Sequence, residues 1–214
     1  DGDWPGTKIC QKKYLKSPKK DWHENHARDQ FQRNAIERGY KEFDDEDLIM
    51  ISDIDEIPNP KKIEEFKIKN KFACFLQKNF QSKINLLNIT DENWVGTKIC
   101  QKKNLISPQW LRSLKIKKRS LWNIFRDKQP QIILNGGWHF SFLKDAESIR
   151  SKIISYSHQE YNTEELTNIN NIKKQILKGE DLFKRDIKYK IVDLDNTFPN
   201  YIFKNKEKFK DWLI

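Results

Sequence analysis

The sequence contains no long apolar run, since nowhere do about 18 apolar residues follow one another. Residues 1–20 also lack the apolar stretch of a secretory signal peptide. Cysteine is scarce, and Cys10, Cys74 and Cys100 have neither a disulfide framework spacing nor a zinc-binding one. An odd number of cysteines favours unpaired thiols in a reducing compartment. We therefore expect no transmembrane segment in this chain and a cytoplasmic location, with attachment to a membrane surface as an alternative.

The composition is that of a globular chain with an excess of positive charge. Its 214 residues include 36% hydrophobic and 12% aromatic side chains, which is enough for one real core. The formal net charge is +10, which raises the possibility of nucleic-acid binding. The lysines are spread along the whole chain beside abundant Asn and Ile, a mixture also expected from a genome rich in A and T. We expect no nucleic-acid partner, but a modest attraction to anionic ligands.

A fifteen-residue block occurs twice. Residues 4–18 recur as residues 94–108, with 12 of 15 positions identical. A stacked repeat fold needs at least three units, so one pair does not predict a solenoid. The near-identity in so short a block favours a recent duplication or recombination over a structural pair. We therefore separate residues 1–20, a duplicated segment outside the ancestral domain, from a main domain over residues 21–214.

Hydrophobic spacing predicts alternating helices and strands. Asp21 and Glu24 form a helix-start signature and Gly39 a stop, which predicts a helix over residues 22–38. The apolar run 47–52 is too short for a buried helix and is typical of a fully covered strand in a parallel sheet. Further strands are predicted over residues 72–80, 94–101, 132–143 with a glycine interruption, and 189–194, and helices over 146–154 and 163–178. The expected fold class is α/β, a mixed sheet flanked by helices.

Asp53 and Asp55 follow directly on the apolar run 47–52. Alternate residues of a strand share a face, so both carboxylates can point the same way at the edge of the sheet. Mg²⁺ or Mn²⁺ is commonly held by one or two carboxylates together with substrate phosphates. An ordinary solvated turn is the alternative. For the second triplet of this kind, Asp193 to Asp195, we predict such an acidic turn, because the surrounding pattern is missing.

Six motifs, in order over residues 21–205, carry a resemblance to a known family. They are residues 24–38 with Gln32, Arg33 and Asn34, then 47–58, 94–97, 108–112, 136–141 and 157–162. Together they resemble glycosyltransferase family 17, the family of the β-1,4-mannosyl-glycoprotein 4-β-N-acetylglucosaminyltransferase. The resemblance implies a GT-A fold, a UDP-sugar donor, a glycan acceptor, inversion at the anomeric carbon, and Mn²⁺ or Mg²⁺ as cofactor.

The resemblance also implies roles for individual residues. At matching positions, Asp53 would face the donor's ribose or the metal, and Asp55 would be the principal metal ligand. Arg33 and Asn34 would contact the donor. The ion would offset the charge of the departing diphosphate.

Two further motifs supply candidate ligands. Trp138 offers a flat face for a sugar ring, with core packing as the alternative. His139 and His158 are candidate metal ligands, and each could instead make structural hydrogen bonds. The glycine pair Gly136-Gly137 allows a turn or a close approach of the backbone to a ligand.

An inverting transfer needs a general base, for which a carboxylate is the usual agent. Glu160 is the favoured candidate and Glu56 the second one. Glu56 could instead cap the next turn or pair with Arg33. Arg112 could hold a carboxylate or phosphate, or tie two strands together.

One feature departs from the family pattern. Only 52 residues precede Asp53, and the first 18 copy a later block, so we expect the nucleotide-binding beginning of the GT-A domain to be truncated or replaced. The predicted function is transfer of N-acetylglucosamine or a related hexose from a UDP-sugar to a glycan hydroxyl. The alternatives are a non-catalytic glycan-binding remnant of the fold and a basic nucleic-acid-binding module.

Overall fold

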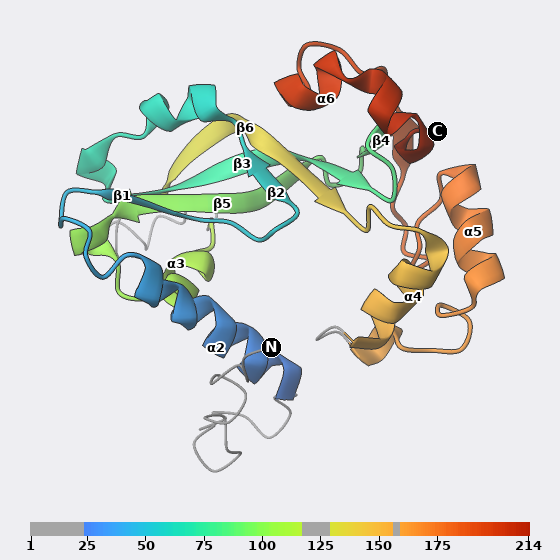
Figure 1. Ribbon diagram of the computed structural model, residues 1–214, viewed down its shortest axis with the longest axis horizontal. Coiled ribbons are helices and arrows are strands. Elements are labelled where there is room, and N and C mark those ends of the chain that lie inside the picture. Colours follow the sequence, from blue (N-terminus) through green and yellow to red (C-terminus); the bar gives the residue numbers. More distant parts are fainter. Residues whose placement is uncertain (1–23, 117–128, 156–158) are drawn as a thin grey trace, which may run out of the picture.

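The computed structural model describes residues 24–116, 129–155 and 159–214 (Figure 1). The strands are β1 (Leu48–Ile51), β2 (Glu56–Pro58), β3 (Phe72–Gln81), β4 (Leu86–Asn88), β5 (Asn93–Gln101), β6 (Gln131–Ser141) and β7 (Tyr189–Ile191). The α-helices are α2 (Glu24–Ala35), α3 (Pro108–Arg112), α4 (Ala146–Ser155), α5 (Ile169–Lys178) and α6 (Asn200–Lys204). Short 3-10 helices are η2 (Ile36–Gly39), η3 (Pro60–Glu65), η4 (Ile68–Asn70), η5 (Lys102–Asn104), η7 (Gln159–Tyr161) and η8 (Lys206–Trp212).

All seven strands belong to one mixed sheet whose centre is β3. Strand β6 runs parallel to β3 along one edge, while β5 and β4 pair antiparallel with different parts of the opposite edge. Strand β1 extends the sheet beyond β5, β2 beyond β6, and β7 beyond β4, each in antiparallel orientation. The predicted mixed α/β architecture is therefore confirmed.

The prediction for β1 was right in position and wrong in environment. Its residues alternate between exposed and buried, with Ile49 and Ile51 inside and Leu48 44% exposed. Its one strand neighbour is β5, and the pairing is antiparallel, so β1 lies at an edge of the sheet. An apolar run does not reveal how many neighbours a strand has, because pairing is set by distant residues.

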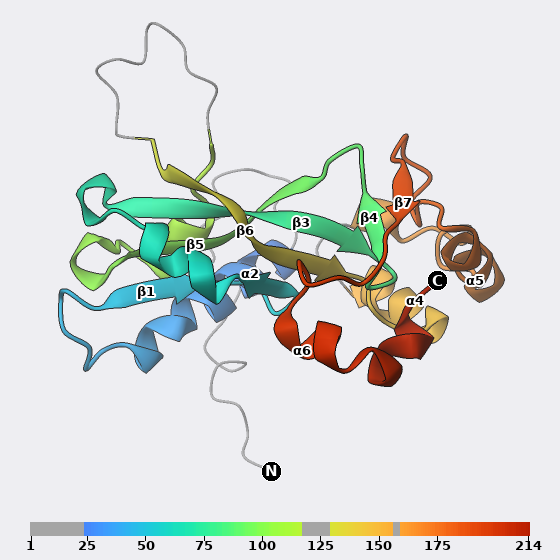
Figure 2. The ribbon, with the colours of Figure 1, turned by 90° about the horizontal axis from the view of Figure 1, so that it is seen from above.

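Helices cover the sheet on both sides and at one end. Figure 1 shows α2 and α3 below the sheet, the turns of η3 and η4 above it, and α4 beside α5 beyond the end of β6; Figure 2 shows the same arrangement from above. Each part has its own apolar cluster: Phe66, Phe75, Ile99 and Ile133 between the sheet centre and η3, and Ile149, Ile153, Ile172 and Leu182 between α4 and α5. The end of β6 therefore lies between the sheet and the α4–α5 pair.

Two predicted helices agree with the structure and a third begins later. Helix α2 continues into η2 up to Gly39, and α4 matches its prediction within one residue. Helix α5 begins at Ile169 rather than near residue 163, because the Asn168 side chain accepts hydrogen bonds from the amides of Asn170 and Asn171 and caps the helix there. The helix ends at Lys178, as predicted, and Gly179 follows it in the left-handed conformation.

The glycine pair lies within β6 and serves strand packing. A Cβ on Gly136 would lie 2.6 Å from Cβ of Phe75, and one on Gly137 would lie 2.1 Å from the carbonyl oxygen of Ile57. Gly137 also has φ +143°, which side-chain-bearing residues rarely adopt. The close approach is therefore made by β3 and β2, and it brings the acidic turn before β2 against β6.

The second copy of the repeated block forms β5, η5 and the residues that lead into α3, whereas residues 4–18 lie outside the described residues. The second acidic triplet leads into a turn that begins at Asp195, which accepts hydrogen bonds from the amide and hydroxyl of Thr197 and, through its carbonyl, from the amide of Phe198. Among the described residues, no helix is long and apolar enough to cross a membrane.

Candidate active site

The acidic segment after β1 forms a reverse turn, closed by a hydrogen bond from the amide of Glu56 to the carbonyl of Asp53 at 3.0 Å. Strand β1 has already ended at Ile51, so the alternation of a strand does not extend to the two aspartates. Their carboxylates consequently meet different partners. Asp53 faces α2 and α3, and Asp55 faces β6 and α4.

Arg112, the last residue of α3, binds two carboxylates at once. Its guanidinium donates to Oδ2 of Asp53 at 2.7 and 3.2 Å and to Oε1 of Glu56 at 2.6 Å. It also donates to the carbonyl oxygen of Gly96 at 3.3 Å, which ties it to β5. Arg112 is thus a carboxylate clamp, and the predicted alternative of Glu56 pairing with Arg33 is wrong.

Glu56 is the buried member of this cluster, and its side chain has no exposed surface. Its carboxylate also accepts from the indole nitrogen of Trp94 at 2.8 Å and from the amide of Asp53 at 3.2 Å. Burial raises the pKa of Glu56 above its usual value, and the nearby charge of Arg112 only partly opposes this shift. For Asp53, burial also acts to raise the pKa, but the hydrogen bonds and charges of Arg112 and then Arg33 outweigh it and lower the pKa.

The predicted donor contacts Arg33 and Asn34 lie on α2 and dock this helix against α3. Arg33 reaches Oδ1 of Asp53 at 3.4 Å and Oε1 of Gln109 at 3.3 Å. The Asn34 side chain accepts from the amide of Gln109 at 3.1 Å. The structure therefore brings Arg33 to Asp53, while a contact of either residue with a donor stays a prediction.

Asp55 has two longer, looser contacts. Its Oδ1 lies 3.8 Å from Nε2 of His139, and its Oδ2 lies 3.7 Å from Nζ of Lys152 on α4. Its backbone carbonyl accepts from the amide of Phe140 at 2.8 Å, which fixes the residue against β6. The carboxylate is 26% exposed and, unlike that of Asp53, no arginine binds it in the described part of the chain.

His139 is held in one orientation by its neighbours on both sides. Its ring stacks on Trp94 at 4.3 Å between centroids with an interplanar angle of 10°, and its Nδ1 lies 2.9 Å from Oδ1 of Asn79. Because the Asn79 amide nitrogen donates elsewhere, to the carbonyl of Asp91, the Asn79 oxygen is an acceptor and Nδ1 must carry the hydrogen. Nε2 then presents a lone pair toward Asp55.

Burial lowers the pKa of His139 to about 4, and the charges of Lys152 and Arg112 act in the same direction against that of Asp55. The imidazole is therefore neutral near pH 7. A neutral imidazole with one nitrogen hydrogen-bonded to an oxygen is the usual form of a metal-binding histidine.

The residues around Asp55 fit a divalent ion with few protein ligands. Two ligand atoms that each lie about 2.1 Å from one ion can be at most about 4.2 Å apart, so a separation of 3.8 Å leaves room for a shared ion. Within residues 24–116, 129–155 and 159–214, no group of three or more His, Cys, Asp and Glu side chains could hold a metal. An ion here would take its remaining ligands from substrate phosphates and water.

The other predicted residues have different surroundings. Trp138 is 8% exposed, belongs to the core cluster with Phe80 and Phe140, and donates to the carbonyl of Thr197 at 3.1 Å, so the core-packing alternative describes its position. Glu160 is exposed on η7, which packs against α4. His158 lies outside the described residues.

Comparison with protein families gives the assignment. The model of glycosyltransferase family 17 matches residues 3–213. The chain belongs to this family. No curated protein and no solved structure matches it significantly. Family 17 membership suggests a glycosyltransferase with a sugar donor and an acceptor.

Three residues of this candidate site were not predicted as site residues from the sequence. Asn79 and Trp94 fix His139, and Lys152 contacts Asp55. Asn79 lies opposite His139 in the parallel β3–β6 register, and Glu56 lies opposite it in the β2–β6 register. A correct alignment of the predicted strands is the signal that would have found Asn79.

Proposed function

We propose that this chain transfers a sugar, N-acetylglucosamine or a related hexose, from a UDP-sugar to a glycan hydroxyl with inversion, on a GT-A-type domain. Family membership supports a glycosyltransferase. A metal-dependent mechanism is supported by one observation: the Asp55 carboxylate and the unprotonated Nε2 of His139 lie 3.8 Å apart. These two residues would hold Mn²⁺ or Mg²⁺, which when bound offsets the charge of the departing diphosphate.

Asp53 has a different role in this proposal. With both arginines on its carboxylate, it is a poor metal ligand, because a bound ion would have to compete with two fixed cations. Its contacts hold the turn in place, so that Asp55 is presented to β6. The 35% exposed carboxylate keeps an edge free for a donor hydroxyl, such as that of a ribose.

The general base is more consistent with Glu160 than with Glu56. The Glu56 carboxylate has no exposed surface and already accepts from Arg112, Trp94 and the amide of Asp53, so an acceptor hydroxyl cannot reach it without breaking the turn. Glu160 is exposed beside α4, the helix that carries Lys152. A base must come within hydrogen-bond distance of the hydroxyl that it deprotonates.

A donor screen tests the proposed function. Purified protein is incubated with Mn²⁺ and a panel of UDP-sugars, and released UDP is measured with and without a glycan acceptor. We expect UDP release from one donor, and a rate of release at least about 100-fold lower in Asp55→Asn. Removing the metal with a chelator should leave the stability of the fold unchanged. The matched control is Asp193→Asn, an exposed aspartate of the other triplet.

Equal turnover by Asp55→Asn and wild type would remove the metal role. The assignment of the base would be reversed if Glu160→Gln kept its activity and Glu56→Gln lost activity while its stability stayed the same. Folded protein that gives no UDP release from any donor would contradict transfer itself.

A non-catalytic glycan-binding remnant is the second candidate. The observation that favours it is the engagement of Asp53 by two arginines, which leaves one aspartate of the triplet for a metal. Isothermal titration with UDP and Mn²⁺ separates the two proposals, because a remnant without a donor site gives no heat.

A further inference from the structure

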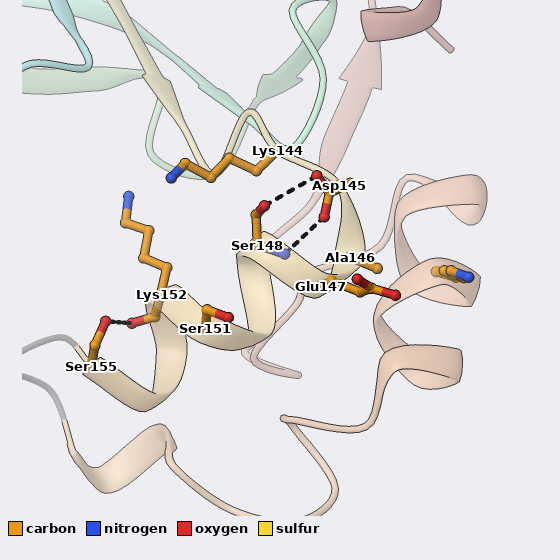
Figure 3. Close-up of a pocket in the computed structure, with 9 residues that line it drawn as sticks. Lys144, Asp145, Ala146, Glu147, Ser148, Ser151, Lys152 and Ser155 are labelled. Carbon is orange, nitrogen blue, oxygen red and sulfur yellow. Dashed lines mark hydrogen bonds between the residues drawn. The ribbon is translucent and has the colours of Figure 1, made fainter.

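A pocket of about 690 Å³ lies along α4 (Figure 3). Its wall includes Lys144 before the helix, Ser148, Ser151 and Lys152 on it, and Lys173 on α5. Figure 3 shows the side chains of Lys144 and Lys152 extending to the same side of α4. Lys152 belongs to this pocket and also contacts Asp55, so the pocket adjoins the proposed metal site.

The lysines of the pocket are only partly neutralised. Lys144 and Lys173 are exposed, and no ion pair joins either of them to another side chain in the described part of the chain. The pocket also contains two acidic residues, Asp145 and Glu147. The Asp145 carboxylate accepts from the amide of Ser148 at 2.8 Å and from the Ser148 hydroxyl at 3.1 Å, and because these neutral donors lower its pKa, it keeps its negative charge. The wall therefore carries three lysines against two carboxylates, and of these lysines Lys144 and Lys173 have no ion pair of their own in the described part of the chain.

We infer that this pocket binds the acceptor, and that the acceptor is an acidic sugar, one that carries a phosphate or a carboxylate. The inference rests on the proposed transferase function. Hydroxyls and ammonium groups around one cavity suit a ligand with both sugar hydroxyls and a negative charge. The size of the pocket is within the range of small-ligand sites and accommodates a sugar rather than a bare anion.

The place of the pocket favours the acceptor over the donor. The donor diphosphate belongs at Asp55 and His139 in the proposed function, and Lys152 stands between that site and the rest of the pocket. A sugar held by Lys144 and Lys173 would therefore approach the donor from the α4 side, the side on which η7 carries Glu160.

Binding without metal or donor tests the inference separately from catalysis. A hexose 6-phosphate, a hexuronic acid, the neutral hexose and inorganic phosphate are titrated against the whole chain, followed by NMR chemical shifts or calorimetry. We expect both acidic sugars to bind at least about tenfold more tightly than the neutral hexose, and more weakly as salt is added. The double variant Lys144→Ala/Lys173→Ala should lose at least about fivefold in affinity.

The matched control is Arg150→Ala/Lys174→Ala, which removes two exposed charges from the same helices outside the pocket and should bind as wild type does. Equal affinity for acidic and neutral sugars overturns the inference. So does equal affinity for inorganic phosphate and the hexose phosphate, which would mean a bare anion site. Displacement of the acidic sugar by UDP without metal would assign the pocket to the donor and also overturn it. These binding measurements need neither donor nor turnover. A failed donor screen would therefore contradict the transferase function without changing them, and failed binding would contradict the pocket inference alone.

Discussion

The Nε2 atom of His139 faces Oδ1 of Asp55 across 3.8 Å, while Nδ1 of the same ring donates to Oδ1 of Asn79. The second bond sets the tautomer, and the stack on Trp94 sets the plane of the ring. Asn79 lies on β3, the strand paired with β6, and Trp94 lies on β5, the other neighbour of β3, so the sheet itself orients the imidazole. This relationship makes Asn79 a positioning residue and distinguishes Asp55 from Asp53.

We predict that Mn²⁺ binding depends on Asp55, His139 and Asn79. Asp55→Asn and His139→Ala should each weaken binding by at least tenfold, and Asn79→Leu by roughly 10- to 100-fold, because it frees the other tautomer. Asn79→Asp keeps an acceptor oxygen and should retain most of the affinity. Electron paramagnetic resonance of free Mn²⁺ measures binding directly, without any turnover.

Asp53→Asn is the discriminating variant for that measurement. Because Arg112 and Arg33 already hold its carboxylate, it should change Mn²⁺ affinity less than Asp55→Asn does. A larger loss of Mn²⁺ affinity for Asp53→Asn than for Asp55→Asn would mean that Asp53 binds the ion in place of the two arginines.

Removal of the Arg112 side chain should destabilise the fold. Arg112→Met leaves the Glu56 carboxylate buried without its cation, and breaking a buried pair in this way costs about 3 kcal/mol or more. Arg33→Met removes a longer contact of a 30% exposed side chain and should cost under about 1 kcal/mol. The free energy of unfolding in urea, measured for both variants, gives the comparison; equal losses would contradict the burial argument.

The parts of the fold that could be predicted are those with strong local patterns. Strands β3 and β5 and helix α4 match their predicted bounds within one residue at each end, and Gly179 ends α5 as glycine often does. The predicted start of α5 near residue 163 was wrong because Asn168 caps the helix further along the chain. Residues 163–167 form an isolated turn instead, closed by a hydrogen bond from the amide of Thr167 to the carbonyl of Thr163. The choice between two local signals depends on packing that the sequence does not display.

The site shows the same division. The acidic triplet and the histidine after the glycine pair could be found by motif, because each is a short block. Their partners could be found only in part: Arg112 was predicted as a possible carboxylate ligand but not assigned to Asp53, and Asn79 was missed, since both are far from the motifs in the chain and meet them through the docking of α3 and strand register. The expectation that Asp53 and Asp55 share a face failed because a turn, rather than a strand, carries them. Local periodicity gives orientation only while the element continues.

Gly137→Ala should disturb the site through the backbone. Its Cβ would lie 2.1 Å from the carbonyl oxygen of Ile57, at a φ of +143°, so β2 must move away from β6 or the backbone must change conformation. We expect a loss of about 2 kcal/mol or more in unfolding free energy and lower donor turnover, because β2 carries Glu56. Gly39→Ala is the control, since nothing lies within 4 Å of its Cβ position. Equal stability of the two variants would show that β2 is free to shift.

Asp181 should make the fold sensitive to acid. Its carboxylate is buried and accepts from the amide and guanidinium of Arg185 at 2.8–3.0 Å and from Gln81 on β3 at 3.4 Å. Burial acts to raise the pKa of Asp181, but the hydrogen bonds from Arg185 outweigh it and lower the pKa below its ordinary value of 3.8. The folded chain therefore holds a proton at Asp181 less tightly than the unfolded chain does. Its stabilising contribution is complete above pH 3.8 or so and is lost as the pH falls through the lower, folded-state pKa.

The measurement is urea unfolding of wild type and Asp181→Asn between pH 7 and pH 2.5. Near pH 7 the variant should be less stable by roughly 1.5–3 kcal/mol, the usual contribution of charged hydrogen bonds, and the difference should shrink as the pH falls below about 4. Asp186→Asn, at an exposed position of the same loop, should follow wild type throughout. A difference that stays constant down to pH 2.5 would mean that the side chain stabilises the fold by its shape and not by its charge, because protonation would then leave its contribution intact.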